Sequence, residues 1–271
     1  MLASREMSAP HLLVLGHITR DEISGTTRLG GAASYAALAA ARLGVDTALV
    51  TVAPPDDALL APLRAEPRLA LHCVPSAVIT AFALTYTGAH RRLWLRQTAR
   101  PLRIDDVPPR WRDAAVTYVG PVAGECDRAL LDALGARFVA AGLQGWLRRA
   151  GDGGEIVPAL APEAITAPHL AAAILSELDH PDAAAIAARF AAAGARVAVT
   201  RGARGATILD GDVRLDIPAA PAVEVDPTGA GDVFGVVLAL ELQRGAPTRD
   251  AAVVAAASAA RVVEGPGLGR L

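Results

Sequence analysis

Residues 226–232 read Asp-Pro-Thr-Gly-Ala-Gly-Asp and lead directly into an apolar stretch at 233–240. This order predicts a glycine-rich turn that opens a buried helix. The first amides of a helix have no partner within it and lie at the positive end of its dipole, so the junction is suited to hold an anion. Asp232 stands inside this phosphate-favouring turn, where a carboxylate would repel phosphate unless it accepted a proton. The pattern predicts phosphoryl transfer to a hydroxyl; a plain helix cap by Asp226 or Thr228 is the alternative.

The composition allows one α/β domain and excludes several kinds of chemistry. The chain has 271 residues, 52% of them hydrophobic, and a formal net charge of −2, which gives no overall basic field for nucleic acid. All 26 residues of the Lys and Arg count are arginine, so a Walker-type lysine, a lysine Schiff base and a lysine general base are excluded. Two cysteines and no long apolar segment lead us to expect a cytoplasmic protein that does not bind membranes.

Strand and helix patterns alternate along most of the chain, which favours a mainly parallel sheet with helices on both faces. A first buried strand ends at Gly16, and the helix after it is closed by Gly44. The expected strands are 12–15, 48–52, 70–74, 115–119, 137–140, 172–175 and 197–200. The expected helices are 32–43, 56–64, 127–134 and 181–193, with two more after Gly229 and Pro247.

Two segments interrupt this alternation. Residues 18–28 are polar and extended, and the alternating runs 81–86 and 92–97 are joined by a turn at 87–91, which predicts a β-hairpin. Neither segment has an obvious place in the central sheet. A solvent-exposed hairpin without a role is the simpler interpretation of the second one.

The heptapeptide at 226–232 closely resembles the signature of the ribokinase-like (PfkB) family of carbohydrate and nucleoside kinases. The resemblance implies a three-layer α/β sandwich over residues 1–271, with a discontinuous β-lid from about 18–29 and 80–98. It makes Asp232 the catalytic base and gives the amides of Gly229, Ala230 and Gly231 the task of holding the transferred phosphoryl group. ATP and Mg²⁺ are the implied cofactors; a monovalent cation and a homodimer through the lid stay open.

The acceptor side of the implied site lies near the N-terminus. Asp21 follows the first strand, where open α/β sheets bind ligands, and a carboxylate accepts hydrogen bonds from two adjacent hydroxyls. By resemblance Asp21 anchors the substrate, and Gly30 and Gly31 let backbone approach it. His17 is a weaker candidate for substrate binding, and a structural loop histidine is the alternative. The family often has Asn four residues after Gly31, but this chain has Tyr35, which argues against ribose or adenosine by simple analogy.

The donor side is implied by two further segments. Ser176-Glu177-Leu178-Asp179 lies where the family has Asn-x-x-Glu, so Ser176 is expected at the nucleotide and Asp179 and Glu177 at magnesium, through water. A cap for the helix at Pro181 is the alternative. The segment 199–206 resembles the nucleotide-side loop of the family. With the signature turn it adds four expected nucleotide-binding residues, Thr200, Gly202, Gly205 and Thr228.

Three features resemble the small myo-inositol kinase branch of the family: the opening Gly-His-x-x-x-Asp, the short chain, and residues 143–148. Gln144 in that last segment offers both a donor and an acceptor to a cyclitol. The expected function is therefore ATP-dependent phosphorylation of a small polyol, with myo-inositol or a related cyclitol first. A sugar or nucleoside kinase of the same family is one alternative, and a non-catalytic nucleotide or sugar sensor is another.

Overall fold

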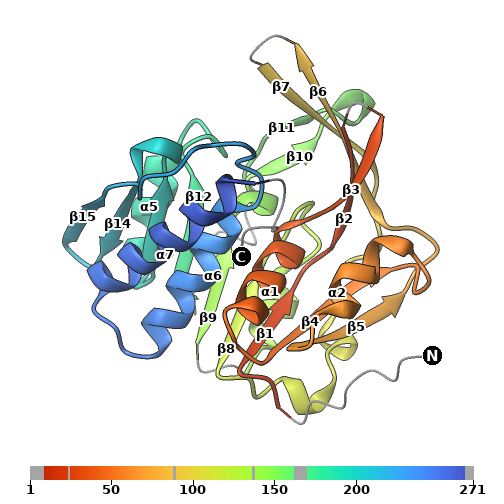
Figure 1. The fold of residues 1–271 in the computed structure, drawn as a ribbon, viewed down its shortest axis with the longest axis horizontal. Coiled ribbons are helices and arrows are strands. Elements are labelled where there is room, and N and C mark those ends of the chain that lie inside the picture. Colours follow the sequence, from red (N-terminus) through yellow and green to blue (C-terminus); the bar gives the residue numbers. More distant parts are fainter. Residues whose placement is uncertain (1–8, 24, 88–89, 136–137, 162–169, 266–271) are drawn as a thin grey trace.

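The computed structural model describes residues 9–23, 25–87, 90–135, 138–161 and 170–265. Its centre is a nine-stranded sheet with the order β15-β14-β13-β12-β9-β8-β1-β4-β5, seen in Figure 1. The strands are β1 Leu12–Leu15, β4 Thr47–Ala53, β5 Leu69–Pro75, β8 Val116–Val119, β9 Val139–Gly142, β12 Leu170–Ser176, β13 Arg196–Thr200, β14 Ala206–Asp210 and β15 Val213–Ile217.

The pairing of these strands is parallel from β13 across to β5 and antiparallel in the last two pairs, β13–β14 and β14–β15. β1 and β4 are buried along their whole length, as expected for central parallel strands covered on both faces. The mainly parallel sheet predicted from the alternation is confirmed. The antiparallel edge arises because only the short turn 201–205 separates β13 from β14, which leaves no room for a crossover helix.

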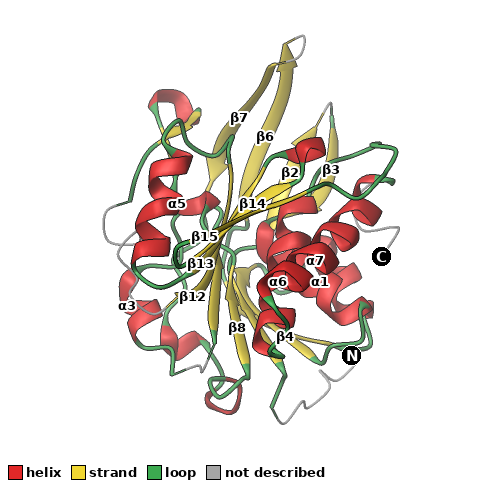
Figure 2. Ribbon diagram, turned by 90° about the vertical axis from the view of Figure 1, so that its left-hand side faces the viewer, coloured by secondary structure: helices red, strands yellow, loops and turns green. Residues whose placement is uncertain are grey.

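Helices cover both faces of the sheet, which Figure 2 shows edge-on. Residues of α1 Ala32–Arg42, α6 Ala230–Gln243 and α7 Thr248–Val263 pack in one hydrophobic cluster, and those of α3 Arg128–Asp132 and α5 Ala183–Ala192 in another. The expected helix at 56–64 is divided into a 3-10 turn, η1 Ala58–Leu60, and α2 Ala61–Ala65. The expected helix at 127–134 is confirmed only as the short α3.

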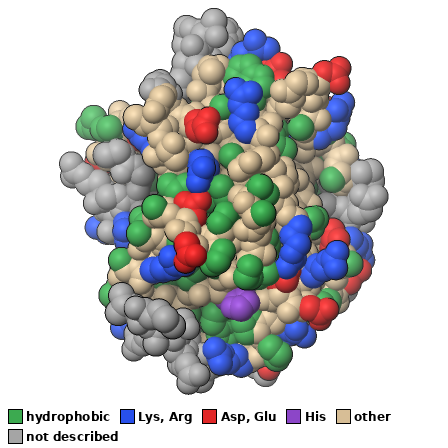
Figure 3. Space-filling model, turned by 90° about the vertical axis from the view of Figure 1, so that its right-hand side faces the viewer, with side chains coloured by type: hydrophobic (Ala, Val, Ile, Leu, Met, Phe, Trp, Pro, Cys, Tyr) green, Lys and Arg blue, Asp and Glu red, His purple; other side chains and the backbone are tan. Residues whose placement is uncertain are grey.

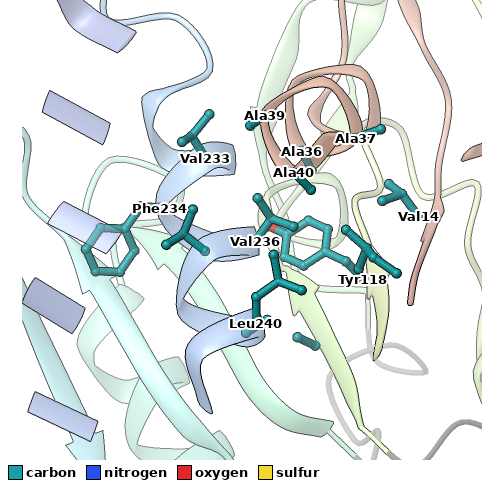
Figure 4. Packing of buried hydrophobic residues seen from close by; sticks show 14 of the residues in the cluster. Val14, Ala36, Ala37, Ala39, Ala40, Tyr118, Val233, Phe234, Val236 and Leu240 are labelled. Atoms are coloured by element: carbon teal, nitrogen blue, oxygen red, sulfur yellow. The ribbon is translucent and has the colours of Figure 1, made fainter. Parts of the chain in front are cut away.

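Helix α6 packs closely on α1 because small side chains face it. Figure 4 shows Ala36 and Ala40 of α1 beside Val236 of α6, with the Tyr118 ring reaching up from β8. These side chains belong to one cluster of buried residues. Alanine lets two helix backbones approach, so α6 is held firmly at the centre of its layer and its N-terminus is fixed in position.

A second sheet stands to one side of the first, with the order β3-β2-β6-β7. Its strands are β2 Thr19–Ile23, β3 Thr26–Gly30, β6 Thr80–Thr87 and β7 His90–Gln97. The predicted hairpin is thus confirmed as β6–β7; residues 88–89 of its turn lie outside the described residues. A small two-stranded sheet, β10 Arg148–Ala150 with β11 Ile156–Pro158, lies against it, and Trp94 of β7 forms a bridge with Glu155.

One face of the described structure has mixed charge, and the described helices are too short or too polar to span a membrane. On the face drawn in Figure 3, arginine and carboxylate side chains are interspersed, and neither sign of charge gathers in one patch. Among the described residues, no helix is both long enough and apolar enough to cross a membrane.

Candidate active site

A cleft of about 890 Å³ lies where the carboxyl ends of the central strands meet the second sheet and the N-terminus of α6. It brings together residues from segments more than 200 positions apart in the sequence. Thirteen of the sixteen residues predicted for the site line it: Asp21, Gly31, Gln144, Ser176, Asp179, Thr200, Gly202, Gly205, Thr228, Gly229, Ala230, Gly231 and Asp232. The other three, His17, Gly30 and Glu177, are not among its lining residues.

The turn before α6 has the geometry of an anion site. Gly229 has φ +83° and forms the N-cap, and its carbonyl accepts from Val233 N–H at 2.9 Å. Ala230 N–H donates to Pro227 O at 3.2 Å, so its amide is already engaged in the turn. Within the described structure, the N–H groups of Gly231 and Asp232 have no backbone acceptor, which leaves them to bind an anion in the cleft.

The capping alternative for this turn is only partly met. Asp226 accepts a hydrogen bond from Thr228 N–H at 3.0 Å, within the turn itself. Within the part of the chain that the structure describes, the N-cap residue Gly229 provides no side-chain hydrogen bond to the first amides of α6. The free end of the helix is therefore available to a ligand.

Asp232 lies in the first turn of α6, half-buried at the floor of the cleft. Burial, and then the negative charge of Asp179, raise the pKa of Asp232 from its usual 3.8 to about 7, and the charge of Arg148 acts in the opposite direction. A carboxylate with a pKa near neutrality is well matched to accept a proton from an alcohol during its attack.

Asp179 is held in place by two hydrogen bonds. Its Oδ2 accepts from Ser176 N–H at 2.7 Å, and its Oδ1 accepts from Gln144 Nε2 at 3.0 Å. The carboxylate therefore turns back toward the end of β12, away from α5, which begins only at Ala183. The alternative, that this segment caps the next helix, is not met, because the N-cap of α5 is Asp182. Gln144 is tied to the donor side of the cleft through Asp179.

Glu177 does not take part in the cleft and pairs with Arg204 instead. Its Oε1 accepts from Arg204 Nη2 at 2.5 Å in an ion pair at the surface. Since Glu177 does not line the cleft, the structure separates it from Asp179, with which it was expected to act.

Asp21 is oriented on the lid side of the cleft. Its Oδ1 accepts from Thr19 Oγ1 at 2.7 Å. Gly30 lies opposite Thr19 in the β2–β3 pairing, and a Cβ added at Gly30 would stand 2.1 Å from Asp21 Oδ2. Gly30 therefore makes room for the Asp21 carboxylate and acts on the site through that side chain.

His17 is fully buried beneath the entry to the lid. Its Nε2 lies 3.0 Å from Arg100 O and its Nδ1 lies 2.8 Å from Thr80 Oγ1, which also accepts from Ala99 N–H. Because a carbonyl only accepts, Nε2 is the donor in its contact with Arg100 O. His17 thus ties the start of the lid at β2 to the start of β6 and the exit from β7, which is the structural alternative weighed for it.

Among the cleft residues that were not in the predicted site, three have contacts that shape it. Tyr35 packs its ring against Gly229, where an added Cβ would be 2.2 Å from Tyr35 Cδ1. Arg148 donates from Nε to Val122 O at 2.9 Å, and its guanidinium lies 5.1 Å from the ring centre of Phe82 in β6. Arg148 could have been predicted, because it lies in the segment 143–148 that also contains Gln144. The sequence around Phe82 contains no feature that predicts a place in the site.

The other end of the cleft is largely apolar. It continues past Thr200, Gly202 and Gly205 between the segment 219–222 and one face of α7, which contributes Ala256, Ala259, Ala260 and Val263. Gly205 has φ +83°, and an added Cβ there would be 2.0 Å from Ile217 O. This glycine is therefore required for the close approach of the turn to β15.

The oxygen atoms that line the cleft fit a magnesium ion only if the ion keeps part of its water shell. Among the described residues, no group of three or more His, Cys, Asp or Glu side chains is arranged to hold a metal. Asp179 lines the cleft, and its charge acts on the nearby Asp232. Because Mg²⁺ keeps several waters and is often bound by one or two carboxylates with substrate phosphates, Asp179 would hold it through water.

Comparison with known proteins agrees with this geometry. Residues 163–270 match the model of the pfkB family carbohydrate kinases. No curated protein sequence gives a significant match to the chain.

Solved structures similar to the chain include a sulfate complex of a pyrophosphate-dependent kinase in the ribokinase family, at 18% identity and TM-score 0.81, covering 94% of this chain and 96% of that one. A Methanocaldococcus jannaschii nucleoside kinase is 18% identical at TM-score 0.74, covering 98% of this chain and 95% of that one. An Arabidopsis thaliana ribokinase complexed with ribose and ATP is 19% identical at TM-score 0.74, covering 96% of this chain and 94% of that one. The predicted resemblance is confirmed: the chain has the fold of ribokinase-family kinases, and its residues 163–270 are similar in sequence to the pfkB family of carbohydrate kinases.

Proposed function

We propose that the chain is an ATP-dependent kinase that phosphorylates one hydroxyl of a small polyol, with myo-inositol or a related cyclitol as its preferred acceptor. The observation that carries the proposal is Asp232, a carboxyl group whose pKa is raised to about 7 by burial and by Asp179. Its own backbone N–H and that of Gly231 are the free amides at the N-terminus of α6. A base and an anion site side by side are what phosphoryl transfer to an alcohol requires.

In the proposed reaction, the acceptor lies between Asp21 and Asp232. Asp232 takes the proton of the attacking hydroxyl as its oxygen bonds to the γ-phosphorus, and the bond to the β-γ bridging oxygen breaks to release ADP. The amides of Gly231 and Asp232 hold the charge of the transferred group. Positioning and electrostatics supply most of the catalysis in such transfers. Mg²⁺, when bound, neutralises charge on the phosphates.

The acceptor half of the cleft supports a compact, polar substrate. Tyr35 packs beside Gly229, and the guanidinium of Arg148 lies over the ring of Phe82, so bulky side chains line the cleft on the acceptor side. Asp21 offers oxygen acceptors to neighbouring hydroxyls. A similar solved structure, at 18% identity and TM-score 0.81, is a ribokinase-family kinase complexed with myo-inositol, which adds to the case for a cyclitol.

Pyrophosphate is the rival phosphoryl donor, because that same similar kinase is pyrophosphate-dependent. The apolar extension of the cleft between 219–222 and α7 favours ATP instead. An adenine base gains from burial against alanine and valine side chains, whereas pyrophosphate has no apolar group to place there.

The test uses purified full-length protein with Mg²⁺ and either ATP or pyrophosphate, each with myo-inositol, ribose, adenosine or cytidine. Phosphate ester formation is followed by ³¹P NMR. We expect turnover with ATP and myo-inositol. Turnover only with adenosine or cytidine would instead indicate a nucleoside kinase, and ligand-dependent thermal shifts without product in any mixture would indicate a sensor.

A further inference from the structure

Glu125 carries a buried carboxylate in the loop between β8 and α3. The residue is 1% exposed, and within the described structure its carboxylate oxygens accept hydrogen bonds from three backbone N–H groups. Oε1 accepts from His17 at 2.9 Å and Oε2 from Ala123 at 2.8 Å, while Val122 N lies 3.1 Å from Oε1 and 3.0 Å from Oε2. Burying a carboxylate without partners is costly, so these contacts fix both the side chain and the amides around it.

The three amides lie beyond the ends of β1 and β8. These strands pair in parallel, and Gly120 N–H, just after β8, donates to Leu15 O at 2.8 Å. Beyond that point the Glu125 carboxylate joins the segment after β1, at His17, to the loop after β8, at Val122. The side chain therefore continues the connection between the two strands where their backbone pairing ends.

Val122 connects this carboxylate to the cleft. The residue lines the cleft and belongs to the hydrophobic cluster of Phe82 and Leu84 in β6. Its carbonyl accepts from Arg148 Nε at 2.9 Å, and the guanidinium of Arg148 lies 5.1 Å from the ring centre of Phe82. Arg148 also lines the cleft. The N–H of Val122 is thus held by Glu125, while its C=O holds an arginine of the acceptor side.

The same loop supports the segment that carries Arg148. A Cβ added at Gly145 would stand 2.3 Å from Pro121 O, so the two backbones pack directly on each other. At the other end of the loop, Trp146 Nε1 donates to Cys126 O at 2.7 Å. The loop 121–126 is therefore the support on which Arg148 is placed, and the position of its first residues depends on Glu125.

The donor side of the cleft is built from other segments. They are residues 176–179 at the end of β12, the turn 201–205 and one face of α7. In the described structure the hydrogen bonds of the Glu125 carboxylate reach none of these segments. A change at Glu125 should therefore affect the acceptor side and spare the donor side.

Resting on the kinase function proposed above, we propose that Glu125 is a positioning residue for the acceptor side of the cleft. Its carboxylate holds Val122, and the Val122 carbonyl holds the guanidinium of Arg148 over Phe82. Glu125 is buried and is not among the described residues that line the cleft, so it acts on a substrate only through these neighbours.

Glu125→Gln keeps the size of the side chain and replaces one acceptor oxygen by an NH₂ group. In either orientation of the amide, that NH₂ faces the N–H of His17 or of Ala123, and two donors cannot bond each other. We expect the KM of the acceptor to rise by roughly 2–10-fold, the equivalent of one hydrogen bond, and the KM of ATP to stay unchanged. Equal changes in both KM values would count against a positioning role.

Asp127→Ala is the matched control. Asp127 lies two residues further along the chain, and its Oδ1 accepts from Leu130 N–H at 2.9 Å as the N-cap of α3. The substitution also removes a bond between a carboxylate and a backbone amide, but at the end of the loop that is remote from Val122. It should lower the Tm, because a helix cap is lost, and leave both KM values unchanged.

A double variant tests whether Glu125 acts through Arg148. Arg148→Lys keeps the positive charge and removes the planar guanidinium that bonds Val122 O. If Glu125 works by holding that guanidinium, adding Glu125→Gln to Arg148→Lys should raise the acceptor KM no further. Additive effects of the two substitutions on the acceptor KM would overturn the inference.

The bond between Arg148 and Val122 can also be followed without turnover. The ¹H–¹⁵N signal of Arg148 Nε, assigned by its loss in Arg148→Lys, reports hydrogen exchange with solvent. Exchange should be roughly 2–10-fold faster in Glu125→Gln than in the unaltered protein and in Asp127→Ala. This result would support the inference even if no tested acceptor were phosphorylated, which would count against the proposed function alone. Equal rates in the unaltered protein and in Glu125→Gln, or the same increase in Asp127→Ala, would overturn it.

Glu125→Asp decides the question if Glu125→Gln does not fold. It keeps the charge but shortens the side chain by one methylene group, which lengthens the contacts with the three amides. The exchange of Arg148 Nε–H should again be faster than in Asp127→Ala, and a rate equal to that of the unaltered protein would overturn the inference.

Discussion

The ionisation of Asp232 makes the pH dependence of turnover the most direct test of the site. With a pKa of about 7, the carboxyl group is ionised in roughly one molecule in ten at pH 6 and nine in ten at pH 8. Because only the ionised form accepts a proton, kcat/KM should rise roughly tenfold between these two values. An Asp with its ordinary pKa would give a flat profile over the same range.

The perturbation that isolates this group is Asp232→Asn, which keeps the size of the side chain but cannot serve as a base. Turnover should fall by roughly 10²–10⁴-fold, the usual contribution of a general base, while the donor still produces a thermal shift. The assay measures initial rates of product formation at half-unit pH steps, with ionic strength held constant and Mg²⁺ in excess. Near-normal turnover in this variant, or a profile already flat above pH 5, would refute the reasoning.

The same raised pKa has a consequence for stability. A carboxyl whose pKa is higher in the folded than in the unfolded protein favours folding at low pH, and that contribution is lost as pH rises through about 7. Asp232→Asn removes the buried charge. The variant should therefore have a higher Tm than the unaltered protein at pH 8, and the difference should shrink toward pH 5 in calorimetry.

The remaining predictions concern the two ends of the cleft. Gly229→Ala should lower the free energy of unfolding by roughly 1–3 kcal/mol in urea titrations, because a side chain at φ +83° is strained and its Cβ meets the ring of Tyr35. Gly231→Ala has open space around the added Cβ and should leave the free energy of unfolding unchanged or raise it. Gly30→Ala should raise the KM of the acceptor and leave that of ATP unchanged, since the added Cβ displaces Asp21; equal changes in both would contradict this. Asp179→Asn should raise the Mg²⁺ concentration needed for half-maximal rate, and an unchanged Mg²⁺ titration would remove it from the metal site.

Much of the fold was predictable because its signals are local. A buried strand at Leu12–Leu15, a helix between Gly31 and Gly44, and a glycine-rich turn before α6 each follow from periodicity and turn chemistry within a short window. The hairpin β6–β7 was predictable for the same reason. Even the choice of Asp232 as the proposed base follows from its place at the start of an apolar helix.

Other features depend on which distant segments meet. The sequence identifies Asp232 as a carboxylate beside an anion site, but its pKa near 7 depends on burial and on Asp179, more than fifty residues away. Likewise, Gly30 is explained only by the Asp21 carboxylate across the β2–β3 pair, and Glu177 parts from Asp179 only because Arg204 lies beside it.

The chain alone thus determined the order of its strands and helices and the kind of chemistry at the start of α6. Only the tertiary structure decided that the phenol of Tyr118 ends close to both Gly142 and Gly235. The reason is physical: backbone preferences and hydrophobic periodicity act over a few residues, whereas burial and charge act through space between groups that the sheet topology brings together.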